Sequence, residues 1–217
     1  MEIEKLIIIA FISYLLGAIP FGLIISRFMG KIDITKHGSG NIGTANVART
    51  VGAKAGSIVM VLDLAKAIVS VLIANIIIGN DLILLAGFPD NLQGQVAQVL
   101  AAILAMVGHN WSIFMKFRGG KGVTAYEGGW LVIYPGLALF GGAIFIITVF
   151  FTRYVSLGSI LGSLGLFLLH IVLTLLFSFP PVYLIFSFLG AVLIIYQHRE
   201  NIQRLRAGTE RRFGNKT

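Results

Sequence analysis

Two stretches combine glycines with cationic and small polar residues, a combination suited to binding phosphate. The first, HGSGNIGTANVAR, contains the cation Arg49 and the hydroxyl of Ser39, and the second, FRGGKG, contains Lys121. Glycine lets backbone N–H groups approach an anion closely and adopt the positive φ of a nest, so both loops are predicted to bind phosphate. The remaining groups expected to contact phosphate are Gly38, Gly40, Asn41, Gly43, Asn46, Gly119, Gly120 and Gly122.

A third polar cluster, YQHRENIQRLRAGTE, occupies residues 196–210. Side chains three positions apart share a helix face, which places His198 beside Asn201 and Asn201 beside Arg204, with Glu200 in the same two turns. The residues alone leave two interpretations open. The cluster is either part of a site or an amphipathic tail attracted to anionic lipid.

Two other phosphate motifs are excluded. GSGNIG, residues 38–43, matches the dinucleotide fingerprint, but that motif follows a strand, and here a long apolar run precedes it. Asp63, twenty residues beyond the last glycine, lies inside another apolar run where it could not reach a ribose. A P-loop would require glycine where Met115 stands. The chain has no cysteine, so thiolate catalysis and cysteine-based metal sites are excluded as well.

Composition indicates that a lipid bilayer surrounds the elements that position these clusters. The 217-residue chain is 57% hydrophobic and 12% charged, whereas soluble domains are about a quarter charged. A membrane-spanning helix needs about 20 apolar residues. The runs predicted to be helices are 3–26, 55–78, 94–115, 155–178 and 181–197.

Residues 128–152 decide the number of spans. One helix there would give six spans and would put the basic C-terminal tail on the same side as Glu2 and Glu4. Two short or re-entrant pieces, broken near Pro135–Gly136 or near Gly141–Gly142, avoid this conflict, and such pieces survive only when buried in protein or lining a cavity. We therefore predict one all-α integral membrane domain over 1–217 with about seven transmembrane helices, the N-terminus outside and the C-terminus cytoplasmic.

The charge distribution supports this topology. All but Lys5 and Lys66 of the 17 lysines and arginines fall at 27–54, 116–121, 153 and 199–216. These places lie between or after apolar runs, where basic residues mark cytoplasmic loops. The opposite side would carry Glu2, Glu4, Lys5, Asp81 and Asp90. The net charge of +8 is therefore interpreted as membrane topology and not as a nucleic-acid footprint.

The three clusters resemble the motifs of the bacterial acyl-phosphate:glycerol-3-phosphate acyltransferases, the PlsY family. The family pattern GSGNxGATNxxR appears as GSGNIGTANVAR at 38–49, and GHxxSxFxxFxGGKGVAT appears as GHNWSIFMKFRGGKGVTA at 108–125. The third, HRENIxRL, appears as HRENIQRL at 198–205. The threonines of the first two motifs stand one residue away from the family's positions, at Thr44 and Thr124, so no role is assigned to either hydroxyl.

The resemblance implies transfer of a fatty acyl group from acyl phosphate to the 1-hydroxyl of sn-glycerol 3-phosphate, giving lysophosphatidate and inorganic phosphate, the first step of phospholipid synthesis. It implies a multi-pass enzyme of the bacterial cytoplasmic membrane with its site facing the cytoplasm, and no cofactor, metal or acyl-CoA. We expect a monomer, although the sequence leaves the oligomeric state open. The alternative from another class is a transporter of a small phosphorylated anion.

Residue roles follow from the resemblance and from the chemistry of an activated mixed anhydride. Lys121, Arg49 and the loop glycines would hold two phosphates. Ser39 would donate to one of them, and a covalent acyl-serine is the alternative that the sequence leaves open. His198, positioned with Asn201, is a candidate base, and the donor's own phosphate is the alternative proton acceptor. The resemblance also places Ser156 near the site.

Five further polar residues receive structural predictions. Asp63 and Lys66, one turn apart in an apolar run, are expected to pair with each other. His109 is expected to make a structural hydrogen bond at a helix end, and His170 to bond a neighbouring helix. Glu127 stands where an apolar or small residue was expected, and we expect it to pair with a nearby cation.

Overall fold

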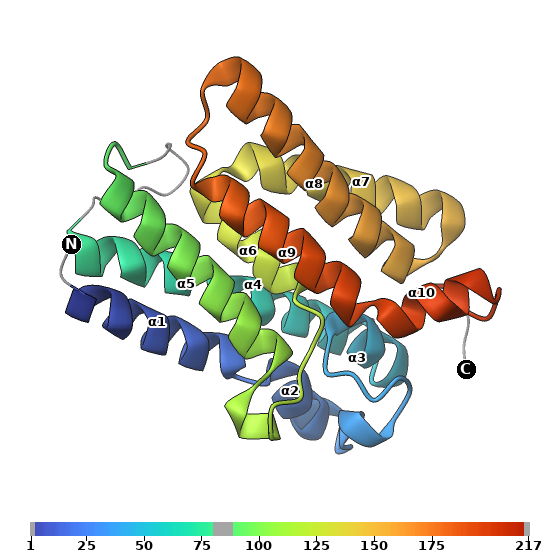
Figure 1. Ribbon diagram of the computed structural model, residues 1–217. Coiled ribbons are helices and arrows are strands. Elements are labelled where there is room, and N and C mark those ends of the chain that lie inside the picture. Colours follow the sequence, from blue (N-terminus) through green and yellow to red (C-terminus); the bar gives the residue numbers. More distant parts are fainter. Residues whose placement is uncertain (1–2, 80–88, 215–217) are drawn as a thin grey trace.

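The computed structural model describes residues 3–79 and 89–214, and helices organise both ranges (Figure 1). Residues Glu2 and Asp81, used above for topology, lie outside the described residues. The helices are α1 (Ile3–Ala18), α2 (Phe21–Gly30), η1 (Ile34–Lys36), α3 (Thr44–Thr50), α4 (Ala53–Ile78), α5 (Leu92–Asn110), η2 (Ile113–Met115), α6 (Val123–Ile133), α7 (Pro135–Thr152), α8 (Val155–Phe177), α9 (Tyr183–Gln197) and α10 (Arg199–Arg206).

The long helices run roughly side by side, and the short helices α2, α3 and α10 gather at the end away from the N-terminus (Figure 1). Within the described ranges, five apolar segments are long enough to cross a membrane: α1 with α2, α4, α5, α7 and α8; α9 is a shorter apolar helix. The two termini lie at opposite ends of the bundle (Figure 1). The predicted all-helical membrane fold is confirmed.

The predicted first span, 3–26, is interrupted. α1 ends at Ala18 and α2 begins at Phe21, with Ile19 and Pro20 between them. Proline has no N–H and its ring clashes with the preceding turn, so one continuous helix could not pass through it. The interruption frees the carbonyl oxygen of Ile19 to accept a hydrogen bond from the Lys66 Nζ of α4 at 3.1 Å.

The region 128–152 is broken as expected, but its two pieces differ from the prediction. The break lies at Tyr134–Pro135, where Tyr134 is extended at φ −155°, as residues before proline usually are. The alternative break at Gly141–Gly142 is wrong, because both glycines lie inside α7. Of the two pieces, α6 with 11 residues is short, whereas α7 has 18 residues. At about 1.5 Å per residue α6 cannot cross a hydrocarbon layer of about 30 Å.

Aromatic packing surrounds this short helix with protein. Trp130 of α6 stacks on Phe186 of α9 with ring centroids 5.2 Å apart, and Tyr126 meets the same ring edge-on at 5.2 Å. The Tyr126 hydroxyl donates to the Ser187 carbonyl oxygen at 3.1 Å. α6 therefore ends inside the bundle and not in lipid, which is the condition for a half-length helix at membrane depth.

Close packing of α1 on α5 fixes the start of the second glycine-rich loop. Gly108 of α5 lies so near α1 that a Cβ there would meet the Tyr14 carbonyl oxygen. The Tyr14 hydroxyl donates to the Trp111 carbonyl oxygen at 2.9 Å, and Ser112 Oγ donates to the Ala18 carbonyl oxygen at 2.5 Å. Small residues let the two backbones approach, and these hydrogen bonds then hold the chain leaving α5.

Candidate active site

The side chain of Asn46, in the first turn of α3, organises the first glycine-rich loop. Its amide nitrogen donates to the carbonyl oxygens of His37 and Asn41 at 3.1 and 2.8 Å. Its amide oxygen accepts the backbone N–H of Ser39 at 3.0 Å, next to Gly38, whose φ is +60°. Both donor hydrogens of Asn46 are used inside the loop, so this side chain shapes the loop around the exposed hydroxyl of Ser39.

Asn41 joins the first loop to the second. Its Oδ1 accepts the N–H of Gly43 at 2.8 Å, and its Nδ2 donates to the carbonyl oxygen of Gly119 at 3.2 Å. The contact bridges 78 positions of sequence. Two loops that are separate in the chain therefore form one polar surface.

The second loop needs its glycines because it packs directly on the end of α5. The N–H of Gly120 donates to the His109 carbonyl oxygen at 2.9 Å, and a Cβ at Gly120 would meet the His109 ring. A Cβ at Gly119 would meet the same carbonyl oxygen. Gly122 has a φ of +81° and leads directly into α6. This path brings Lys121 and the first turn of α6 together at the cavity.

The third cluster meets Lys121 through Asn201, to whose Oδ1 the Lys121 Nζ donates. The centre of this cluster is Glu210, a residue that the sequence analysis did not select. Its Oε1 accepts from Asn201 Nδ2 at 2.6 Å and from Ser156 Oγ at 2.7 Å, and its Oε2 accepts from Arg204 Nε at 2.8 Å. Glu210 therefore holds α8, α10 and the C-terminal tail together beside Lys121.

No periodicity could have identified Glu210. It lies 54 positions from Ser156 and beyond the end of α10, in a stretch without regular structure. The tail that follows it is tied down, because Phe213 N–H donates to the Arg153 carbonyl oxygen at 2.7 Å and Arg211 donates to the Gly38 carbonyl oxygen at 3.4 Å. The sequence offered one signal: Glu210 is an acid at the end of the polar cluster 196–210, and Arg206, Arg211 and Arg212 stand close to it.

His198 is buried at the junction of α9 and α10, and one of its ring nitrogens is committed. Nδ1 lies 2.8 Å from the Ile194 carbonyl oxygen, an acceptor, so Nδ1 carries the proton and Nε2 keeps its lone pair. Burial, with the neighbouring Lys121 charge, lowers the pKa of His198 to about 4. The imidazole is therefore neutral at physiological pH and is a weak base.

The cations of the site are held close together. Burial lowers the pKa of Lys121 to about 8, with the charges of Arg204 and Arg49 acting in the same direction. Burial, followed by the charge of Arg211, also lowers the pKa of Arg49, whose Nε has no partner within the described ranges. Burial raises the pKa of the Glu210 carboxyl, but hydrogen bonds from Asn201, Ser156 and Arg204 outweigh this and hold the pKa below its usual range. A crowded cationic site of this kind favours an anion.

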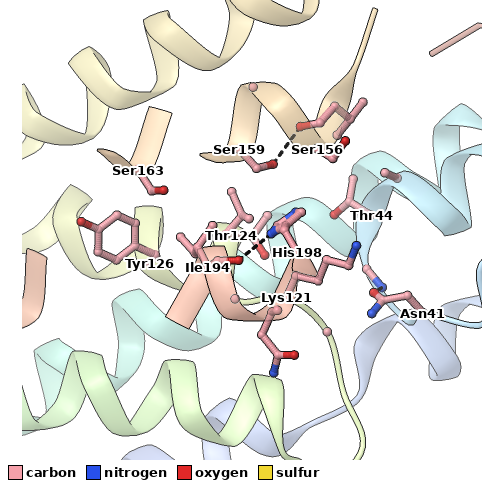
Figure 2. A pocket seen from close by; sticks show the side chains of 18 of the residues that line it. Asn41, Thr44, Lys121, Thr124, Tyr126, Ser156, Ser159, Ser163, Ile194 and His198 are labelled. Carbon is pink, nitrogen blue, oxygen red and sulfur yellow. Dashed lines mark hydrogen bonds between the residues drawn. The ribbon is translucent and has the colours of Figure 1, made fainter. Parts of the chain in front are cut away.

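A cavity of about 1150 Å³ connects these groups. Figure 2 shows Lys121 and His198 in its middle, with Asn41 and Thr44 on one side and Ser156, Ser159 and Ser163 of α8 across from them. The structure brings together all of the predicted site residues except Gly40, which does not line the cavity. Those that line it are Gly38, Ser39, Asn41, Gly43, Asn46, Arg49, Gly119, Gly120, Lys121, Gly122, Ser156, His198, Glu200 and Asn201.

Their surroundings differ. The Glu200 side chain is 71% exposed and lies 3.9 Å from Arg204, at the rim. The Ser156 hydroxyl is engaged by Glu210, and its contact with phosphate stays a prediction.

The predicted pairing of Asp63 and Lys66 is confirmed and has a third member. Lys66 Nζ lies 2.9 Å from Asp63 Oδ1, and His109 Nδ1 lies 3.5 Å from the same oxygen. The Asp63 and Lys66 side chains are each 2% exposed. His109 thus belongs to a buried charged cluster near the end of α5, in line with the structural role predicted for it.

The expected bond between His170 and a neighbouring helix is also present, because its Nδ1 lies 3.0 Å from Ser187 Oγ of α9. The cation partner expected for Glu127 is not found among residues 3–79 and 89–214. In the same ranges no three His, Cys, Asp or Glu side chains are grouped to hold a metal ion.

The fold and the site define a polytopic membrane protein with a cationic, glycine-lined cavity for a phosphorylated substrate at one end of its bundle. The sequence profile described as glycerol-3-phosphate acyltransferase matches residues 7–208. Glycerol-3-phosphate acyltransferase 3 of Dehalococcoides mccartyi is 42% identical over the full length of both chains.

Two solved structures agree with this match. Crystal structures of PlsY (YgiH), an integral membrane glycerol 3-phosphate acyltransferase, in its glycerol 3-phosphate and lysophosphatidic acid forms superpose with TM-scores of 0.82 and 0.80 at 33% identity. Both alignments cover 96% of this chain, and 96% and 95% of the respective structures. The chain belongs to the glycerol-3-phosphate acyltransferase family, so the enzyme class that its motifs predicted is confirmed and the transporter alternative is set aside.

Proposed function

We propose that this cavity transfers a fatty acyl group from acyl phosphate to the 1-hydroxyl of glycerol 3-phosphate. The observation that carries the proposal is the convergence of Lys121, Arg49, the glycine loops and the open first turn of α6 on one cavity. Helix N-termini and glycine-rich backbone offer N–H groups to phosphate, and the two cations offset its charge. The relative whose glycerol 3-phosphate form is known shares the fold at 33% identity, which supports the acceptor.

The reaction needs orientation more than activation. The acceptor oxygen attacks the acyl carbon, the bond from that carbon to the phosphate oxygen breaks, and inorganic phosphate leaves. Lys121 and Arg49 hold the two phosphates and offset the charge that develops on the leaving group. Asn201 acts as a positioning residue, because its Oδ1 accepts from Lys121 while its Nδ2 donates to Glu210. Ser39 donates to one phosphate from the exposed loop.

The proton of the attacking hydroxyl finishes on phosphate. A pKa of about 4 makes His198 a weaker base than a phosphate group, whose second pKa is about 6. The free Nε2 of His198 accepts a hydrogen bond from the hydroxyl and orients it, and the leaving phosphate takes the proton. This division of roles chooses the second of the two acceptors that the sequence left open.

The site faces the cytoplasm of a bacterial cell in this proposal. The basic segments at 27–54, 116–121 and 199–216 include the loops that form the cavity, and positively charged loops remain on the cytoplasmic side. Glycerol 3-phosphate then reaches the cavity from water, and the acyl chain reaches it from the bilayer. We propose no metal and no cofactor for the reaction, and treat residues 1–217 as one catalytic domain.

The donor is tested by supplying labelled glycerol 3-phosphate to purified enzyme with either palmitoyl phosphate or palmitoyl-CoA. We expect labelled lysophosphatidate with palmitoyl phosphate and none above the no-enzyme blank with palmitoyl-CoA. The reverse pattern would overturn the proposed donor while leaving the acceptor and the family intact. Inverted and right-side-out vesicles test the orientation, since only the form that exposes the C-terminal tail should use external substrate.

A further inference from the structure

The cavity continues from the phosphate loops into the bundle between α6, α7 and α8. We call this continuation the membrane arm, and define it by Glu127, Leu131, Leu139, Ala143, Ser159 and Ser163. Leu139 of α7, which lines the arm, is 69% exposed, so the arm opens to the surface of the apolar bundle there. An acyl chain attached to a phosphate in the cavity has this direction open to it.

Glu127 is a carboxyl in the wall of this arm. It lies one turn into α6, and its neighbours pack elsewhere: a Cβ at Gly128 would meet α4 at the Leu64 carbonyl oxygen, while Tyr126 packs on α9. Its Oε1 reaches the crossing of α7 and α8, since a Cβ at Gly141 would lie 3.3 Å from Oε1 and 3.2 Å from the Gly162 carbonyl oxygen. Among the described residues the Glu127 carboxylate has no ion pair and no hydrogen bond.

The serines across the arm do not supply that missing donor. Ser159 Oγ donates to the Val155 carbonyl oxygen at 3.0 Å, and Ser163 Oγ donates to the Ile160 carbonyl oxygen at 3.0 Å. Figure 2 shows both serines on the cavity side of α8. Their hydroxyl hydrogens are used within the helix, so toward the arm they present only acceptor oxygens. Together with Glu127 they form a polar band in an otherwise apolar passage.

This band lies part way along the path of an acyl chain. Gly162, beside Glu127, follows Ser156 by six residues on α8, which corresponds to about 9 Å at 1.5 Å per residue. A short chain bound with its phosphate near Ser156 ends before Glu127 and leaves its carboxyl hydrated. A long chain covers the carboxyl with methylene groups, and burying a charged or polar group without a partner is costly.

We propose that Glu127 is a specificity-determining residue. Its polar side chain in the membrane arm lowers the preference of the enzyme for acyl chains that are long enough to cover it. Each methylene buried before the carboxyl tightens binding about fourfold, and those beside it tighten binding less because they displace water from the carboxyl. The inference rests on the proposed acyl-phosphate donor. Glu127 touches the chain and not the reacting atoms, so it changes selectivity and leaves the chemical step in place.

The test compares two variants of similar side-chain length and opposite polarity, Glu127→Met and Glu127→Gln. The ratio of kcat/KM for palmitoyl phosphate to that for hexanoyl phosphate is measured in each. Glu127→Met should raise this ratio about tenfold, since the long chain then no longer covers an unpaired polar group. Glu127→Gln, which keeps a polar group at the band, should shift it less than half as far on a logarithmic scale. Glu4→Met, at an exposed position of α1, is the matched control and should match the unmodified enzyme.

Three outcomes separate the ideas. An unchanged ratio in Glu127→Met would overturn the inference, and equal shifts in both variants would also contradict it, because they would assign selectivity to the charge of Glu127 and not to the polarity of the band. Failure of the unmodified enzyme to use either donor would instead overturn the proposed function. A chain-length series on the unmodified enzyme tests the same point without a variant: the gain in affinity per methylene should drop at an intermediate length, and a uniform gain along the series contradicts the polar band.

Discussion

The molecule contains two networks of charged residues with opposite relations to water. Asp63, Lys66 and His109 are buried where α4 packs on the end of α5, and there Lys66 is paired with Asp63 and also donates to the Ile19 carbonyl oxygen. The second network, centred on Lys121 and Glu210, lines the cavity. In the first network the charges of Lys66 and Asp63 pair with each other. In the second, among the described residues, the Arg49 Nε has no hydrogen-bond partner and the Nε2 of His198 makes no hydrogen bond.

This difference separates charges that hold the fold from charges that bind substrate. A paired charge inside a membrane protein stabilises the packing of the helices that carry it, here α4 with α5 and with the break between α1 and α2. A cationic cluster with spare hydrogen-bonding capacity is costly by itself, and is explained by a ligand that completes it. Substitutions in the first network should therefore change stability, and those in the second should change kinetics.

The largest effect is expected from Asp63→Asn. It leaves Lys66 charged and unpaired in the bundle, and breaking a buried ion pair costs about 3–5 kcal/mol. Thermal unfolding of the purified protein in detergent should show a strongly lowered Tm, whereas Glu4→Gln, an exposed acid on α1, should stay within about 0.5 kcal/mol of the unmodified protein. A Tm equal to that of the Glu4→Gln control would remove the distinction between the two networks.

Lys121→Met should have the next largest effect, and on rate instead of stability. Removing a preorganised group that stabilises developing charge lowers kcat by about 10²–10³-fold. Lys36→Met, an exposed lysine outside the cavity, is the control and should retain activity. The distinction between the two networks fails if Lys121→Met lowers the stability of the protein but leaves the kcat of its folded fraction unchanged.

A smaller loss, about tenfold in kcat/KM, is expected for Glu210→Gln. The neutral amide weakens the hydrogen bonds from Asn201, Ser156 and Arg204, and hydrogen bonds to a charged group contribute about 1.5–3 kcal/mol. Because Glu210 positions Asn201 and the tail, the loss should fall mainly on the KM for glycerol 3-phosphate. Thr209→Ala, the exposed neighbour, should behave as the unmodified enzyme. An effect confined to kcat would place Glu210 in the chemical step instead.

The smallest effect concerns pH. The lowered pKa of Lys121 means that its ammonium loses the proton as pH rises through about 8, so kcat/KM should fall above that pH. Lys121→Arg keeps its charge at higher pH, so the fall of kcat/KM should begin at a higher pH in this variant, even though its rate is lower. His198, with a pKa of about 4, stays neutral above that value and should produce no limb between about pH 5 and 7. An alkaline limb at the same pH in Lys121→Arg would assign it to another group.

Sequence patterns predicted the parts of the fold that depend on local chemistry. Long apolar runs predicted the spans, and the residue pair Pro135–Gly136 marked the break that makes α6 short. The break at Pro20 was missed because it lies inside a run that is apolar throughout, where hydropathy alone gives no boundary. Cavity residues in the two glycine-rich motifs were found because glycines stand beside cations there, and those in the third motif were assigned through the family resemblance.

Contacts between distant segments could not be predicted in the same way. Asp63 and Lys66 were paired from their spacing, but His109 comes from another helix. Asn46 was expected to face phosphate, yet its amide is used by the loop backbone around it. Glu210 acquires its role only when the tail folds back on α8 and α10. Each of these depends on tertiary packing, which one-dimensional spacing does not encode.

The central claim is that the cationic cavity carries out acyl transfer from acyl phosphate. The most direct test is the release of inorganic phosphate from palmitoyl phosphate by purified, detergent-solubilised protein, with and without glycerol 3-phosphate, and with Lys121→Met in parallel. The account predicts release that depends on glycerol 3-phosphate, that is matched by lysophosphatidate formed, and that falls by about 10²–10³-fold in the variant. Folded protein that releases no phosphate above blank, or a variant as active as the unmodified enzyme, would contradict it.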